Sequence, residues 1–145
     1  MKTYHIQTQK DDVLLSIDQQ EETLMIPVQG KWYTDGRSPL LPLFSEYAGL
    51  APKVILDLSK LDYRWLDGIL RCVVTEYWQT SSQVMVITPS DHPRWVDLLI
   101  FCYHNSSVPT GAHPGALSIQ CGDYVWHHGE ELDSDFSSLL TKLSR

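Results

Sequence analysis

The run KVILDL, residues 53 to 58, constrains the fold more than any other stretch of this chain. It is almost continuously apolar, and it lies after Gly49 and Pro52, which end a preceding helix. A strand with this pattern is buried on both faces, as in a sheet that helices cover. We therefore predict an α/β fold built around this strand.

Amphipathic helices are predicted on both sides of that strand. After it, apolar residues recur at i, i+3, i+4, i+7, i+8, i+11 and i+12 from Leu66 to Trp78, an unbroken helical period. Asp67 falls on the opposite, polar face of this helix. Before the strand, apolar spacings of three and four up to residue 50 indicate a helix that starts near residue 38 or 39. Strands joined through helices lie parallel or nearly so, which predicts a mixed sheet.

The other elements complete a single domain over residues 1–145, in the order β-β-α-β-α-β-α-(β)-α. VLLSI and TLMIPV form a hairpin in which Pro27 favours an edge strand, and GKWYTDGRS after it is interpreted as a loop. The strand QVMVIT precedes a helix after Pro93. Beyond Asn105 come a loop, a last strand for which ALSIQ and GDYVWH are alternatives, and a C-terminal helix in SDFSSLLTKLS.

Charge and composition restrict the partners and the compartment. The net charge is -7, from 18 acidic and 11 basic residues, which argues against binding to nucleic acid. No apolar run approaches the roughly 18 residues of a membrane span, so no membrane insertion is expected, and a cytoplasmic location is predicted. The three cysteines are widely spaced, without a CxxC pair, and are interpreted as reduced structural thiols.

The element order and the stretch VILDLSKLDYRWLDG resemble the STAS domain family, which includes anti-sigma-factor antagonists, stressosome components and cytoplasmic domains of anion transporters. The signature of that family is an apolar strand ending in Asp-Leu-Ser, then Asp-Ser-Ser/Thr-Gly at the start of an amphipathic helix. Residues 54–59 match the strand, and Gly68, Ile69 and Leu70 match the start of the helix. The resemblance covers roughly residues 12–104, and QGKW is similar to a loop of STAS proteins linked to lipid transport.

The resemblance implies a non-enzymatic protein–protein interaction or regulatory domain of bacterial signalling type, without a cofactor. Alignment on Asp57 and Gly68 places Trp65 at the aspartate of the family, Leu66 at its first serine, and Asp67 at the phosphorylated serine or threonine. No hydroxyl remains there, so a phosphorylation switch is not expected at this position. The implied partner is a kinase, an anti-sigma-like protein or a transporter-associated protein, and a homodimer is a further option.

The predicted binding surface comprises the loop 59–67 and the first half of the following helix. Its residues are Ser59, Tyr63, Arg64, Trp65, Asp67, Gly68 and Arg71. Trp32, Tyr33, Tyr63 and Trp65 lie in loops beside the predicted helix, where an exposed aromatic ring would be an interface anchor.

Asp67 has two interpretations, which the sequence leaves open. A carboxylate in a first helical turn is stabilised by about 0.3 to 1 kcal/mol, because unpaired N–H groups and the positive end of the helix dipole lie there. A phosphoserine would carry about -1.5 to -2 charges. Asp67 is therefore either an ordinary residue of a helix start or a permanent, partial phosphoserine mimic on a partner-binding surface.

An alternative is a receiver-like signalling domain that accepts a phosphoryl group on Asp57, with Asp11 and Asp12 as the acidic pair and Thr88 as the switch hydroxyl. Two observations oppose it. The acidic pair precedes the first apolar strand that the pattern shows, and no lysine lies between Lys60 and Lys142.

Other chemistry has weaker support. HHGEELDSD, residues 127–135, invites a metal site, but adjacent histidines on an extended segment point to opposite faces, and a solvated acidic loop is the preferred interpretation. The chain has no G-x-S-x-G elbow and no nucleotide-binding glycine loop. No enzymatic activity is therefore predicted.

Overall fold

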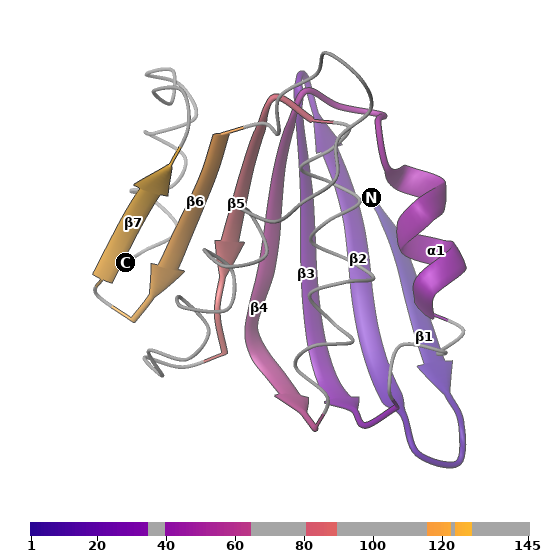
Figure 1. The fold of residues 1–145 in the computed structure, drawn as a ribbon. Coiled ribbons are helices and arrows are strands. Elements are labelled where there is room, and N and C mark those ends of the chain that lie inside the picture. The colour runs from indigo at the N-terminus through magenta and orange to yellow at the C-terminus, as the bar shows by residue number, and fades with distance from the viewer. Residues whose placement is uncertain (35–39, 65–80, 90–115, 123, 129–145) are drawn as a thin grey trace, which may run out of the picture.

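The computed structural model describes residues 1–34, 40–64, 81–89, 116–122 and 124–128. These residues form one mixed sheet of seven strands and one helix, α1 (Leu40–Tyr47) (Figure 1). The strands are β1 (Lys2–Gln7), β2 (Asp12–Gln20), β3 (Thr23–Trp32), β4 (Lys53–Tyr63), β5 (Gln83–Ile87), β6 (Ala116–Cys121) and β7 (Tyr124–His128). Among the described residues, no helix combines the length and the hydropathy of a membrane span.

The strands lie side by side in the order of the sequence, β1 to β7. β1, β2 and β3 are antiparallel, β3 to β6 are parallel, and β7 is antiparallel to β6. The predicted mixed sheet is thus confirmed, as are the hairpin and the helix before β4. The helices predicted at 66–78, after Pro93 and at the C-terminus lie outside the described residues.

Several segment boundaries differ from the prediction. β1 was not predicted, because KTYHIQ offers only Tyr4 and Ile6 to the core on an edge strand. GKW belongs to β3 and residues 59–63 belong to β4, so neither segment is a loop. ALSIQ and GDYVWH are not alternatives, because β6 contains the first segment, β7 begins within the second, and the two strands pair with each other.

A β-bulge explains how β4 continues beyond its apolar half. Pro27 pairs with Asp57 but Gln29 pairs with Lys60, so β4 contains one more residue than β3 between these two pairs. The extra residue resets the alternation of faces, and Leu58 and Leu61, three positions apart, are both buried. Pro27 lies on a central strand, contrary to the edge position predicted for it. Bulges are among the few places where a sheet tolerates proline.

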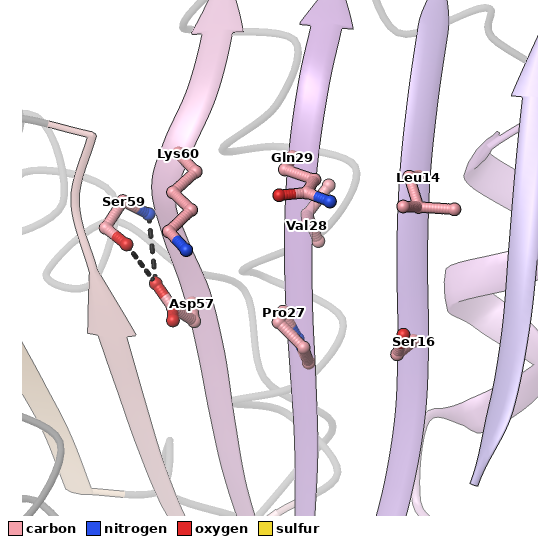
Figure 2. A pocket seen from close by; sticks show the side chains of 8 residues that line it. All are labelled: Leu14, Ser16, Pro27, Val28, Gln29, Asp57, Ser59 and Lys60. Atoms are coloured by element: carbon pink, nitrogen blue, oxygen red, sulfur yellow. Dashed lines mark hydrogen bonds between the residues drawn. The ribbon is translucent and has the colours of Figure 1, made fainter.

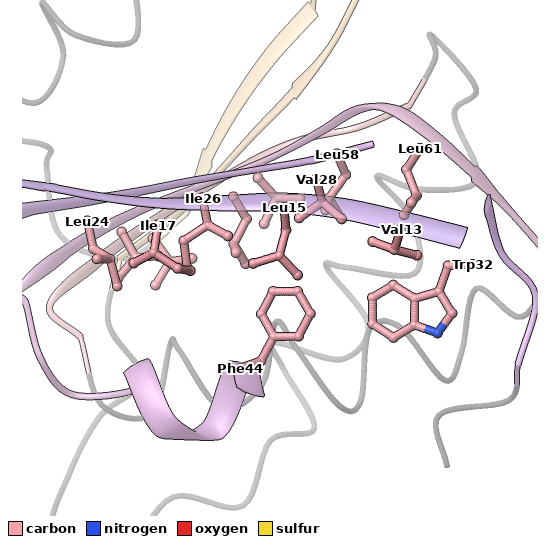
Figure 3. Close-up of a cluster of buried hydrophobic side chains, with 14 of the residues drawn as sticks. Val13, Leu15, Ile17, Leu24, Ile26, Val28, Trp32, Phe44, Leu58 and Leu61 are labelled. Carbon is pink, nitrogen blue, oxygen red and sulfur yellow. The ribbon is translucent and has the colours of Figure 1, made fainter. Parts of the chain in front are cut away.

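The main core lies on the face of the sheet that α1 covers (Figure 3). Phe44 of α1 is fully buried and stacks on Trp32 of β3, with ring centroids 5.8 Å apart and an interplanar angle of 3°. Trp32 therefore belongs to the core and is not an exposed interface anchor. Val54 and Leu56 of β4 join this cluster, whereas Ile55 packs on the other face, which confirms burial of this strand on both faces.

Glycines occupy two positions where the backbone permits little else. Gly49, with φ of 82°, lies just beyond α1, where the sequence predicted the end of the helix. Gly30 has φ of 106°, and a Cβ atom there would lie 2.1 Å from the carbonyl oxygen of Asp12. The close pairing of β2 and β3 at this point therefore requires glycine.

Candidate functional site

The predicted site residues divide between described and undescribed parts of the chain. Ser59 is exposed at the β4 bulge, Tyr63 is half-buried against the core, and Arg64 is exposed just after the strand. Trp65, Asp67, Gly68 and Arg71 lie outside the described residues. The interpretation of Asp67 thus stays a prediction.

Asp57 and Ser59 form a local contact at the bulge. One oxygen of Asp57, Oδ1, accepts hydrogen bonds from the backbone N–H of Ser59 at 3.0 Å and from its hydroxyl at 2.6 Å (Figure 2). Both residues lie on a shallow surface hollow of about 140 Å³, which Lys60 and parts of β2 and β3 also line. This geometry commits one carboxylate oxygen of Asp57 to holding the irregular part of β4.

Asp11 fastens the turn after β1 to the end of β3. Its side chain is buried, its Oδ1 accepts from the N–H groups of Tyr33 at 2.8 Å and Thr34 at 3.2 Å, and its Oδ2 accepts from the Thr34 hydroxyl at 2.7 Å. The hydroxyl of Thr8 in turn accepts from the Asp11 N–H at 2.9 Å. A buried carboxylate needs several donors of this kind. Asp11 is therefore a structural residue.

Tyr33, Asp62 and Arg64 form a second group of contacts at the same end of the sheet. The Tyr33 hydroxyl donates a hydrogen bond to the Asp62 carboxylate, and this bond raises the pKa of Tyr33 above its ordinary value. The Arg64 guanidinium lies over the Tyr33 ring, 4.4 Å from its centroid. The backbone N–H of Arg64 also donates to the backbone carbonyl of Trp32 at 3.3 Å, which extends the pairing of β3 and β4.

These contacts border a surface hollow of about 640 Å³, which we call the strand-end hollow. Its lining residues are Thr8, Gln9, Lys10, Asp11, Asp12, Lys31, Tyr33 and Arg64. In Figure 1 the arrowheads of β3 and β4 lie at the same edge of the sheet as the β1–β2 turn. Open sheets commonly bind ligands at the carboxyl ends of parallel strands. Ser59 and Tyr63 do not line this hollow, whereas Arg64 does.

The sequence did not identify Lys10 and Lys31 as members of a site. They are distant along the chain from Arg64, and each stands alone in its own segment. The register brings them together, because Lys31 pairs with both Asp12 and Asp62 across its two neighbouring strands. Tyr33 was singled out as a loop aromatic, which the structure places on the lining of the hollow.

The acidic residues of the receiver-like alternative are far apart. Asp57 pairs with Pro27 of β3, whereas Asp11 contacts Tyr33, which lies six positions after Pro27 and just beyond the end of β3. At about 3.3 Å per residue, this separates them by about 20 Å along the sheet. The Thr88 hydroxyl, moreover, donates to the Gln120 carbonyl at 3.2 Å. Asp11 and Asp57 are therefore too far apart to share one magnesium ion.

The histidine-rich segment is described only in part. His127 and His128 belong to β7, and the acidic residues after them lie outside the described residues. Within the described ranges, no three His, Cys, Asp or Glu residues are grouped as metal ligands would be. Cys121 is buried, and the other two cysteines lie outside these ranges.

Comparisons with known proteins found no matching family model, no matching curated protein and no matching solved structure.

Proposed function

We propose that this chain is a non-enzymatic interaction domain of STAS-like type that binds a regulatory partner protein in the cytoplasm. The partner would be a kinase, an anti-sigma-like protein or a transporter-associated protein, with a homodimer as a further option. The full STAS-like order, with helices between the parallel strands, is part of this proposal. So is the absence of a phosphorylation switch at Asp67.

The observation that carries the proposal is the exposed end of β4. The strand leads into Arg64, whose guanidinium rests on the Tyr33 ring, immediately before the segment 65–68 that resembles the family motif. Arginine and aromatic side chains are the residue types that most often supply binding energy in protein interfaces. An arginine positioned in this way loses less side-chain entropy on binding than a freely moving one.

Capture of the partner from an extract of source cells tests the proposed surface. We expect Trp65→Ala, Asp67→Ala and Arg64→Ala each to reduce the amount of the specifically captured partner, identified by mass spectrometry. Lys2→Ala is the matched control for Arg64→Ala, because Lys2 is also exposed but lies at the far end of β1 from the strand-end hollow. Unchanged capture by both Trp65→Ala and Asp67→Ala would refute the site assignment.

The receiver-like alternative has a direct test of its own. On our proposal, incubation with acetyl phosphate and Mg²⁺ leaves the intact protein without a bound phosphoryl group, as intact-mass analysis would show. The reason is that Asp57 lies about 20 Å from Asp11 along the sheet. A base-labile phosphoryl group that disappears in Asp57→Asn would favour the alternative instead.

A further inference from the structure

We propose that the strand-end hollow binds an acidic segment of a partner protein, whose carboxylate or phosphate groups are held by Lys10, Lys31 and Arg64. The inference rests on the proposed function and deepens it, because it names the chemistry of the partner that this end of the sheet would bind. Three observations on the charged groups of the hollow support it, and a fourth, on its lining, indicates the kind of ligand.

The carboxylates at the hollow already have partners within the chain. Asp11 is buried and accepts from the N–H groups of Tyr33 and Thr34. Asp12 accepts from His5 Nε2 at 2.6 Å, and the neighbouring Asp62 accepts from the Tyr33 hydroxyl. An incoming cation would have to compete with these bonds.

The basic side chains at the hollow, unlike its carboxylates, have no partner of opposite charge among the described residues. Lys10, Lys31 and Arg64 are exposed, and none forms an ion pair with a carboxylate of the described residues. Lys53 at the other end of β4, by contrast, pairs with Glu22 at 3.8 Å. Three unpaired basic groups around one hollow stand out in a chain of net charge -7. Their free donors favour an anionic ligand.

The position of Arg64 suits a planar anion. Its guanidinium lies over the Tyr33 ring, so the ring covers one face of the group and the N–H donors remain at its edge. Arginine uses such edge donors in pairs to bind a carboxylate or a phosphate. The Tyr33 hydroxyl keeps Asp62 engaged, which leaves the guanidinium available to a ligand from outside the chain.

The lining of the hollow favours a polypeptide segment over an enclosed small molecule. Small-molecule sites are predominantly apolar and bury most of their ligand. The strand-end hollow instead offers one aromatic ring, and its other lining residues are polar or charged. Its volume of about 640 Å³ accommodates a few side chains of a segment that passes across the surface.

Fluorescence anisotropy with a labelled hexaglutamate peptide tests this inference on the full chain. At low ionic strength we expect saturable binding that weakens as salt is added, and no binding of a hexaglutamine peptide. Arg64→Glu and Lys31→Glu should each weaken binding about tenfold or more, since a charge-assisted bond is lost and a repulsion is added. A peptide with phosphoserines in place of glutamates shows by its relative affinity which anion is preferred.

Lys2→Glu is the matched control, because it changes the net charge equally at an exposed strand position at the other end of β1. At an ionic strength of about 0.1 M we expect it to change the affinity by less than about twofold, since screening then weakens charge effects beyond about 10 Å. The neutral variant Arg64→Gln, which removes the positive charge without adding a negative one, should also weaken binding. The thermal unfolding transition of each variant establishes that it is folded.

Two results would overturn the inference: no hexaglutamate binding by the unmodified chain, or an equal loss in Lys2→Glu and Lys31→Glu. Its failure is distinguishable from failure of the proposed function. If partner capture depends on Trp65 and Asp67 but the peptide does not bind, the proposed function stands without this inference. If the peptide binds at the hollow while Trp65→Ala and Asp67→Ala leave the amount of captured partner unchanged, the proposed site is wrong and the hollow remains an anion site.

Discussion

In the first half of β4, Lys53 to Leu58, apolar side chains face both sides of the sheet, whereas the second half, Ser59 to Tyr63, presents polar side chains on one side. The first half pairs with both β3 and β5, and the second half pairs with β3 alone among the described strands. Burial thus stabilises the first half. The second half depends on a bulge, one buried leucine and a few hydrogen bonds. Just beyond it, the exposed Arg64 has no ion pair with a described carboxylate.

Truncation of the two buried leucines tests this comparison with the largest expected effect. Leu56→Ala in the first half and Leu61→Ala in the second should each lower the free energy of unfolding by about 2 to 5 kcal/mol, because both side chains are buried. Chemical denaturation measures both values. Lys60→Ala, at the exposed position beside Leu61, should change stability by less than about 0.5 kcal/mol. If Leu61→Ala costs no more than Lys60→Ala, the bulge is misplaced.

Removal of the Asp11 carboxylate should have the next largest effect. Asp11→Ala leaves the N–H groups of Tyr33 and Thr34 without their acceptor, which costs about 1 to 3 kcal/mol of stability. The same denaturation experiment on Asp12→Ala provides the control, because Asp12 is exposed and its pair with His5 should contribute less than about 1 kcal/mol. Equal losses in the two variants would mean that Asp11 does not fasten the β1–β2 turn to β3.

The same contrast explains what the sequence could predict. The first half of β4 and the hairpin were identified from short apolar runs, and α1 was identified from apolar spacings of three and four. The second half of β4 was missed because the bulge breaks the alternation between Leu58 and Leu61. β1 offers too few apolar residues to be recognised. Burial of Trp32 depends on its stacking with Phe44, twelve positions along the chain, which no local pattern contains.

The site was predictable to a smaller extent than the fold. The family resemblance indicated Arg64, which does line the strand-end hollow, and Ser59 and Tyr63, which lie nearby on β4. Lys10 and Lys31 were missed because strand register alone brings them to the same place. Long-range pairing of this kind carries no signal within a single segment. The roles of Trp65 to Arg71 stay predictions.

A smaller effect on stability is expected at the bulge itself. Ser59→Ala removes the hydroxyl bond to Asp57 but keeps the backbone bond, so it should lower the free energy of unfolding by about 0.5 to 1 kcal/mol. Ser59→Thr retains a hydroxyl and should retain most of the stability in the same measurement. If the alanine and threonine variants are equally stable, the hydroxyl bond does not support the second half of β4.

The smallest effect concerns the pH dependence of the strand end. The hydrogen bond to Asp62 raises the pKa of Tyr33 above the value of about 10 that a free tyrosine has. The phenol donates this bond only when protonated. The stability that this bond contributes is therefore complete below the pKa of Tyr33 in the unfolded state, and it is lost as pH rises through the pKa of Tyr33 in the folded state.

The tyrosinate absorbance, as a difference between the unmodified chain and Tyr33→Phe, should report the raised pKa of Tyr33. Asp62→Asn should lower that value, since it removes the charged acceptor. An unchanged titration in Asp62→Asn would show that Asp62 is not held by Tyr33. A free Asp62 could then neutralise Arg64, and the strand end would lose the unpaired cation that distinguishes it from the rest of β4.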